Sequence, residues 1–297
     1  MARWSSRRKR WLLAFLIPIL IIVVTVGCVP WIMRSSIVRE SLLRQANGVL
    51  APARLKIADW SFSWFGPTQL FGVSLLDGDG RLDFVIKQPQ QTSDPGVWQL
   101  STNTFKVEAY RHDGKFLWRN DLGWNIEQGV WWSPMIVADF DGDGKAEVAL
   151  KTAPMDKVYR NAAGRILDGP EYLSVWNGET GKEIAHVDWP SRGNVADWGD
   201  KVGNRASRHL IGLAKLDGQR TSLLALRGTY TTMLVDAYNL VNGKLEKVWS
   251  WNGDKETPQV RGQGMHGMHA ADVDGDGREE IILGAAVVDD NGRTLWN

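Results

Sequence analysis

Residues 139–150 read DFDGDGKAEVAL, and residues 272–283 repeat the pattern as DVDGDGREEIIL. In both stretches acidic residues alternate with glycines over a short loop, and an apolar run typical of a β-strand follows. The first copy along the chain, LLDGDGRLDFVI, begins at residue 75, and a degenerate copy, AKLDGQRTSLLAL, begins at residue 214. A unit that recurs in this way indicates a chain assembled from repeats of one structural element.

A hairpin signal follows each of the four loops. Glycine-containing turns separate apolar segments in YRHDGKFLW, VWNGETGKEI, YNLVNGKLEKVW and VVDDNGRTLW, which begin at residues 110, 175, 238 and 287. Turns of this composition join the two strands of a hairpin. Loop, strand and hairpin in succession are typical of one blade of a β-propeller, although the repeats here are longer than a standard blade of about 40 to 50 residues. The sequence therefore predicts an all-β chain that forms a partial β-propeller of about four blades with long inserts.

The acids within the loops point to calcium. They fall at positions 1, 3, 5 and 9 of the two complete copies, and glycines between them let a tight loop turn several carboxylates toward one centre, as the six to eight oxygen ligands of Ca²⁺ require. The alternative is an acidic turn that solvates its own charges. The first copy has Leu75 in the leading position and predicts a weaker site, and the copy at residue 214 predicts a turn without metal. The predicted ligands are Asp139, Asp141, Asp143, Glu147, Asp272, Asp274, Asp276 and Glu280, with Asp77, Asp79 and Asp83 in the first loop.

Composition and charge exclude several classes of protein. The chain of 297 residues is 43% hydrophobic and 23% charged, which excludes bulk disorder. Its 16 tryptophans suit short strands with aromatic packing or a sugar-binding surface. Five of the 35 basic residues lie in the first ten positions, so the 34 acidic residues outnumber the bases of the remaining chain. A body without a basic stripe argues against nucleic acid as a partner.

The N-terminal part has a different character. Residues 11–33 carry no charge and are long enough to span a membrane, and the preceding RRKR predicts a cytoplasmic N-terminus. A rival interpretation makes Cys28 the lipidated N-terminus of a lipoprotein. Either one predicts a membrane-anchored, extracytoplasmic body. We expect three parts: a basic tail and transmembrane anchor over residues 1–34, a juxtamembrane helix and strand segment over 35–74, and the partial propeller over 75–297.

Longer sequence blocks indicate a family. They are KTAP at residue 151, YLSVWNGETGKEI at 172, PSRGNVADWGDKVGNR at 190, GQGMHGMHAADVDGDG at 262 and GAAVVDDNG at 284. From about residue 76 to residue 297 the chain closely resembles the rhamnogalacturonan lyases of polysaccharide lyase family eleven. Residues 53–75 are weakly similar to the membrane-proximal start of bacterial inner-membrane assembly proteins of the AsmA-like kind.

The resemblance implies an eight-bladed, calcium-binding propeller that cleaves the backbone of rhamnogalacturonan I, a pectin, by β-elimination at galacturonate. The family continues through further blades and a Gly-His-Gly-Asp block that have no counterpart here. The resemblance therefore implies that about half of the propeller is missing, and whether this chain is active stays open. The strand edges that would be left open predict self-association.

The same resemblance places the candidate site residues. His266 occupies the position of a functional histidine, suited to act as base on the C5 proton, and Arg192 and Arg205 are candidates for holding the uronate carboxylate. Lys151 is a candidate second base or carboxylate partner. The candidates for binding sugar hydroxyls or a further Ca²⁺ are Asn194, Asp197 and Asp200. The competing explanations are packing or hydrogen bonding for His266, a charge at a strand end for Lys151, and a turn-rich loop that bonds to itself for the other residues.

Two other functions stay open at this point. The same loops would serve a non-enzymatic, calcium-dependent carbohydrate-binding propeller. Alternatively, the N-terminal segment would define an envelope assembly protein.

Overall fold

The computed structural model describes residues 41, 59–61, 69–71, 77–88, 96–256, 258–262, 264 and 266–296. The chain divides into two compact units, Met1–Val73 and Ser74–Asn297. In the first unit, β1 (Asp59–Ser61) and β2 (Gln69–Phe71) form an antiparallel pair. The functional residues considered below all belong to the second unit.

Four antiparallel sheets make up the described part of the second unit, and in each the strands pair in chain order. The first sheet contains β3 (Phe84–Gln88), β4 (Lys106–Tyr110) and β5 (Phe116–Asp121). The second contains β6 (Met135–Ala138), β7 (Glu147–Thr152), β8 (Tyr172–Asn177) and β9 (Glu183–Asp188). The third contains β10 (His209–Ala214), β11 (Ser222–Arg227), β12 (Leu234–Val241) and β13 (Lys244–Asn252). The fourth contains β14 (His269–Ala271), β15 (Glu280–Leu283), β16 (Ala286–Val288) and β17 (Thr294–Trp296).

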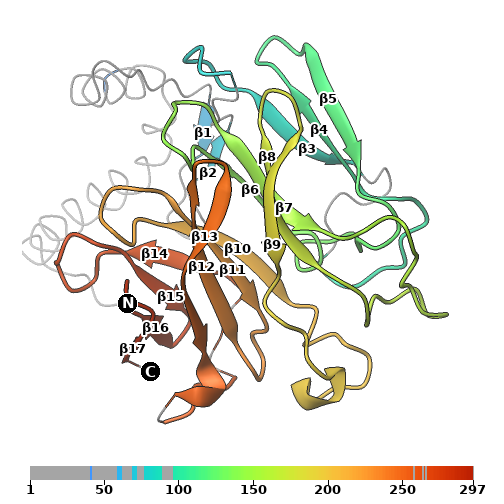
Figure 1. Cartoon of the computed structure of the whole chain (residues 1–297), viewed down its shortest axis with the longest axis vertical. Helices are drawn as coiled ribbons and strands as arrows, with labels where there is room; N and C mark the ends of the chain where they lie inside the picture. The colour runs from blue at the N-terminus through green and yellow to red at the C-terminus, as the bar shows by residue number, and fades with distance from the viewer. Residues whose placement is uncertain are drawn as a thin grey trace, which may run out of the picture. The chain divides into compact units, whose positions relative to one another are not determined.

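Successive sheets pack face to face. Figure 1 shows them in chain order across the second unit, from β3–β5 in cyan and green to β14–β17 in red. Alternate residues of a strand point to opposite faces of its sheet. In β11, Leu224 and Leu226 therefore pack against Ile281 of the fourth sheet, while Leu223 and Ala225 pack toward the second. Every residue of β7 and β11 is buried because both faces of these strands are covered.

Tryptophans of the outer strands join neighbouring sheets at the hairpin turns. The indole N–H of Trp118 in β5 donates to the carbonyl of Gly178, 2.8 Å away, in the turn of the next sheet. Gly181 of that turn has φ of +67°, and a Cβ there would lie 2.5 Å from Trp118. Trp249 of the third sheet makes the same contact with the fourth sheet, since its indole N–H donates to the carbonyl of Asp290 at 2.7 Å. These two tryptophans therefore serve packing between sheets.

The structure confirms the all-β class and corrects the predicted propeller. The described residues of the second unit form four separate antiparallel sheets, and none closes on itself. The reason lies in what the repeat encodes. Loop, strand and hairpin fix the pairing inside each sheet, whereas the way successive sheets are set around an axis depends on contacts that the repeat does not report.

The predicted membrane anchor and the location derived from it are also corrected. Among the residues described here, no helix is long and apolar enough to cross a membrane. Residues 11–33 and the rival lipidation site at Cys28 lie outside the described residues.

Candidate functional site

Two acidic loops have the same internal geometry. In the loop between β6 and β7, both oxygens of Asp139 accept backbone N–H groups, from Gly142 at 2.6 Å and Gly144 at 2.9 Å. In the loop between β14 and β15, Asp272 accepts from Gly275 at 2.7 Å and from Gly277 at 3.1 Å. All four glycines have φ between +81° and +89°, a conformation that side chains rarely adopt. The Asp-Gly alternation is thus a requirement of the turn as well as a source of charge.

The carboxylates of these loops gather closely enough to hold a cation. Oxygens of Asp139, Asp141 and Glu147 lie within 4.8 Å of one another. Burial, reinforced by repulsion from Asp141 and its neighbouring aspartates, raises the pKa of Glu147 to about 7. An opposite charge would relieve this repulsion. The second loop therefore fits a hard divalent cation such as Ca²⁺.

The loop between β14 and β15 draws in one further acid. Asp272, Asp274 and Asp276 form one group of oxygens within 4.8 Å, and Asp274, Glu280 and Asp289 form another. Asp289 comes from the turn between β16 and β17 and is absent from the predicted ligand set. Glu280 is fully buried, and its Oε1 has no hydrogen-bond partner among the described residues. A buried carboxylate oxygen without a donor is the feature that a bound cation would satisfy.

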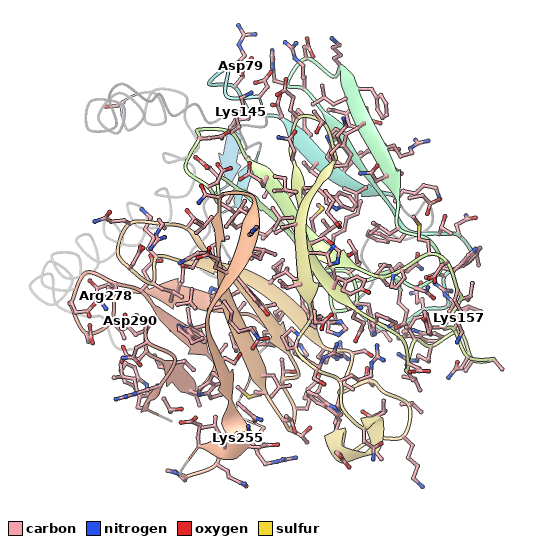
Figure 2. The ribbon with its side chains drawn as sticks, in the orientation of Figure 1. Asp79, Lys145, Lys157, Lys255, Arg278 and Asp290 are labelled. Atoms are coloured by element: carbon pink, nitrogen blue, oxygen red, sulfur yellow. The ribbon has the colours of Figure 1, made fainter. Side chains whose placement is uncertain are left out.

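The first loop is surrounded by basic groups. The Arg111 guanidinium lies 3.9 Å from Asp77, and Nδ1 of His112 lies 3.7 Å from Asp79. The backbone N–H of His112 donates to Asp83 at 2.8 Å. In the part of the chain that the structure describes, no group of three metal-ligand oxygens includes the first loop. Figure 2 shows Asp79 of this loop near Lys145, which belongs to the second acidic loop. Metal binding by the first loop stays a prediction.

We expect Ca²⁺ to stabilise the folded chain through the two complete loops. Each occupied site adds RT ln(1 + [L]/Kd), about 2.7 kcal/mol at a hundredfold excess over Kd. Asp274→Asn changes the residue shared by both groups of oxygens in the loop between β14 and β15 and should remove one of the bound ions. Calorimetric titration counts the ions, and melting with and without chelator measures the stabilisation. Equal melting temperatures in Ca²⁺ and in chelator would contradict this expectation.

A buried ionic cluster lies at the other end of the second sheet. β7 begins at Glu147 in the acidic loop and ends beside Lys151, whose Nζ lies 2.8 Å from Glu171. Glu171 also pairs with Arg227 and, at 2.6 Å, with Arg192. Burial alone would raise the pKa of Glu171, but the surrounding cations hold it well below its usual range. Two predicted site residues, Lys151 and Arg192, are therefore brought together, and both are engaged by a carboxylate that the sequence did not single out.

His209 is the uncharged neighbour of this cluster. Its imidazole is buried, its Nε2 lies 3.9 Å from Glu171, and its ring meets Trp189 edge-on at 5.5 Å between centroids. Burial, helped by the charges of Lys151 and Arg227, lowers the pKa of His209 well below its usual value. The folded protein therefore keeps His209 neutral where the unfolded chain would protonate it.

The depressed pKa of His209 predicts loss of stability in mild acid. Below the ordinary histidine pKa of about 6.5, the unfolded state takes up a proton that the folded state refuses, so the free energy of unfolding falls by up to about 1.4 kcal/mol per pH unit. His209→Gln should remove this contribution. Urea unfolding of both proteins between pH 7.5 and pH 5 measures the difference in slope, and parallel pH profiles would contradict the assignment.

His266 and Arg208 lie near the same two aromatic rings, those of Trp131 and Tyr230. The imidazole of His266 lies 4.5 Å from the ring of Trp131, and its Nε2 is 2.5 Å from the hydroxyl of Tyr230. The Arg208 guanidinium lies 5.4 Å from the ring of Trp131 and 5.5 Å from that of Tyr230. Nε and Nη1 of Arg208 have no hydrogen-bond partner within the described residues. We call Trp131, Arg208, Tyr230 and His266 the His266 site.

In the loop from Pro190 to Arg205, the side chains of Asn194 and Asp200 bond to the loop's own backbone. Two other side chains of the loop bond outside it, since Arg192 pairs with Glu171 and Asn204 accepts from Nη2 of Arg208 at 3.1 Å. Asn194 caps the short helix η1 (Val195–Trp198) by accepting from the N–H of Ala196 at 3.2 Å. Asp200 accepts from the backbone N–H groups of Val202, Asn204 and Arg205, the last at 2.7 Å. Asp197 is exposed on η1, and Arg205 packs against Gly199. Among the described hydrogen bonds and ion pairs, none joins Asn194, Asp197, Asp200 or Arg205 to Glu171 or to the His266 site.

Sequence reasoning missed Arg208, Tyr230, Glu171, Arg227 and Asp289. Arg208 directly precedes β10, Arg227 is the last residue of β11, and Tyr230 lies three residues after Arg227. All three therefore lie at the same end of the third sheet. The SRHL and LRGTY segments that carry these residues have no recurring spacing. Only Asp289 could have been proposed as a ligand from the sequence, because it lies in the VVDDNG turn that follows an acidic loop.

Comparison with known proteins settles the family. The family model described as rhamnogalacturonan lyase family 11, C-terminal domain, matches residues 68–297. The chain belongs to rhamnogalacturonan lyase family 11. Two family 11 proteins of Bacillus subtilis (strain 168) are similar in sequence: the rhamnogalacturonan endolyase YesW is 44% identical and the exolyase YesX 43% identical, each over 236 residues. The family predicted from the sequence is thereby confirmed, and its relatives are polysaccharide lyases.

Solved family 11 structures agree with the fold. The crystal structure of YesW superimposes with a TM-score of 0.71 at 40% identity, covering 82% of this chain and 45% of that one. The Bacillus licheniformis rhamnogalacturonan lyase gives 0.71 at 42% identity, with the same coverage of both chains. The matched region is 75% of this chain and 38% or 39% of the Bacillus subtilis relatives. The chain thus spans less than half the length of these relatives.

Proposed function

We propose that this chain acts on rhamnogalacturonan I as a lyase, cleaving the glycosidic bond at galacturonate by β-elimination. The observation that carries the proposal is the His266 site, where an exposed imidazole bonded to a tyrosine hydroxyl lies beside an arginine with two unpaired donors. Elimination needs a base for the C5 proton, a positive charge for the uronate carboxylate, and a proton for the departing O4. Family membership supports the same reaction.

Each group of the His266 site has one role in this scheme. His266 removes the proton from C5, the electron pair of that C–H bond forms the C4–C5 double bond, and the C4–O4 bond breaks. Tyr230, in hydrogen-bond contact with Nε2 of His266, returns a proton to O4. Arg208, whose buried Nε and Nη1 are unpaired, supplies positive charge for the uronate carboxylate, where negative charge grows. Trp131 offers a ring face for a sugar.

The other predicted residues support the site from a distance. Lys151 and Arg192 are tied to Glu171, so we assign them to holding the loop from Pro190 onward rather than to the substrate. Ca²⁺ in the acidic loops would lock the opposite edge of the same sheets by neutralising their carboxylates. No step of the reaction is assigned to it.

Incubation with rhamnogalacturonan I tests the proposal. Only β-elimination leaves an unsaturated uronate that absorbs in the ultraviolet, so absorbance should rise with rhamnogalacturonan I and stay flat with polygalacturonate, which lacks rhamnose. A folded, Ca²⁺-loaded protein that binds rhamnogalacturonan I without any rise in absorbance would contradict the lyase and leave calcium-dependent carbohydrate binding.

A further inference from the structure

A cleft lies between the outer strands of the second and third sheets. It has a volume of about 910 Å³ and runs along β9 on one side and β12 and β13 on the other. This size falls in the range of about 300 to 1,000 Å³ typical of small-ligand sites. Its lining includes no residue of the His266 site and none of the acidic loops. Nothing in the proposed reaction uses it.

Aromatic side chains form one wall of the cleft. The ring of Tyr172 lies against that of His186 with centroids 4.7 Å apart and a tilt of 40° between the planes, and the His186 side chain is 48% exposed. Nδ1 of His186 is held by Glu183 at 2.7 Å, which fixes the plane of the exposed ring. Trp189 closes the same wall, and its buried indole N–H has no partner among the described residues. A fixed ring with polar groups beside it is the arrangement that recognises a sugar face.

Charged side chains supply the polar contacts. The cleft is lined by three carboxylates and two ammonium groups, from Asp188, Asp236, Glu256, Lys247 and Lys255. Lys247 is already paired with Asp236 at 3.0 Å and lies 5.3 Å from the ring of Tyr238. Figure 2 labels Lys255, near the end of β13. The excess of carboxylates disfavours an anionic sugar, whereas carboxylates accept readily from the hydroxyls of a neutral one.

We propose that this cleft binds a short oligosaccharide of neutral sugars, separately from the lyase site. Tyr172 and His186 provide the stacking platform, and Asp188 and Asp236 accept hydrogen bonds from sugar hydroxyls. The lining of the cleft shares no residue with the His266 site, so a bound glycan would leave that site free. Such a second site would raise the local concentration of a polymer that carries neutral sugars.

Calorimetric titration of the full chain with galactotetraose, a neutral tetramer, tests the proposal directly. We expect measurable binding by the wild-type protein. Ser250→Trp fills the cleft from β13, where Ser250 is exposed, and should weaken binding at least about tenfold. Glu246→Trp is the matched control, because Glu246 is exposed on the same strand and does not line the cleft. Its affinity should equal that of the wild type.

Two further measurements separate this site from the lyase. His186→Ala removes the exposed ring of the platform and should weaken galactotetraose binding without loss of fold, whereas His266→Ala should leave that binding unchanged. Absence of binding by folded wild-type protein, equal affinity in Ser250→Trp, or loss of binding in His266→Ala would each overturn the proposal. Tighter binding of trigalacturonate than of galactotetraose to the cleft would overturn the assignment to neutral sugars.

Discussion

Alanine in place of His266 is expected to lower kcat on rhamnogalacturonan I by about 10² to 10⁴, the usual contribution of a general base. The imidazole is exposed and bonded to the Tyr230 hydroxyl at 2.5 Å, so its removal takes away a proton acceptor without opening the core. The measurement is the initial rate of ultraviolet absorbance at saturating substrate. Melting temperature and Ca²⁺ stoichiometry should not change, which separates loss of chemistry from loss of fold.

His269→Ala provides the matched control for the first prediction. His269 is exposed at the start of β14, three residues from His266, and makes no contact in the His266 site. Its variant should retain the wild-type rate. Tyr230→Phe should also slow turnover, because the ring stays and only the hydroxyl that would return the proton is lost. Full activity in His266→Ala would assign the base to another residue.

Glutamine in place of Glu171 is expected to lower the free energy of unfolding by about 3 to 5 kcal/mol. Glu171 is the acid that pairs with Lys151, Arg192 and Arg227 in the buried ionic cluster. Its side chain is only 7% exposed, and that of Arg227 is fully buried. Without the carboxylate, three cations are left close together with little access to water. The cost is therefore that of uncompensated buried charge rather than that of one lost ion pair.

Glu179→Gln is the control for the second prediction, since it makes the same substitution in an exposed pair. Glu179 lies 3.1 Å from Lys145, and both side chains are more than 40% exposed. Exposed pairs contribute about 0 to 1 kcal/mol, so this variant should unfold almost like the wild type. Urea unfolding of both variants measures the contrast. A loss below about 1 kcal/mol in Glu171→Gln would contradict the account of the cluster.

The acidic loops were predictable because their chemistry is local. Asp139 and its glycines act within nine residues, and the same hydrogen bonds recur at Asp272 because the same letters recur. Short-range turn geometry and carboxylate spacing are both written in consecutive residues. The strand-and-hairpin units were predictable for the same reason, as was the family, which the long polar blocks carry.

The His266 site and the ionic cluster required the folded chain. Arg208 meets Trp131 and Tyr230 only because segments far apart in sequence end at one edge of adjoining sheets. Glu171 gathers cations from β7, β11 and the Pro190 loop, and no spacing in the sequence connects them. The propeller prediction was wrong for the same reason. Pairing within a sheet depends on residues close in sequence, whereas the mutual arrangement of sheets depends on contacts between distant segments.

A crystal structure of the His266→Ala chain with Ca²⁺ and a rhamnogalacturonan I tetrasaccharide tests the central claim most directly. We expect a galacturonate in the His266 site, with its carboxylate beside Arg208 and its C5 facing the space left by the imidazole. Density for the tetrasaccharide elsewhere, with Arg208 untouched, would contradict it.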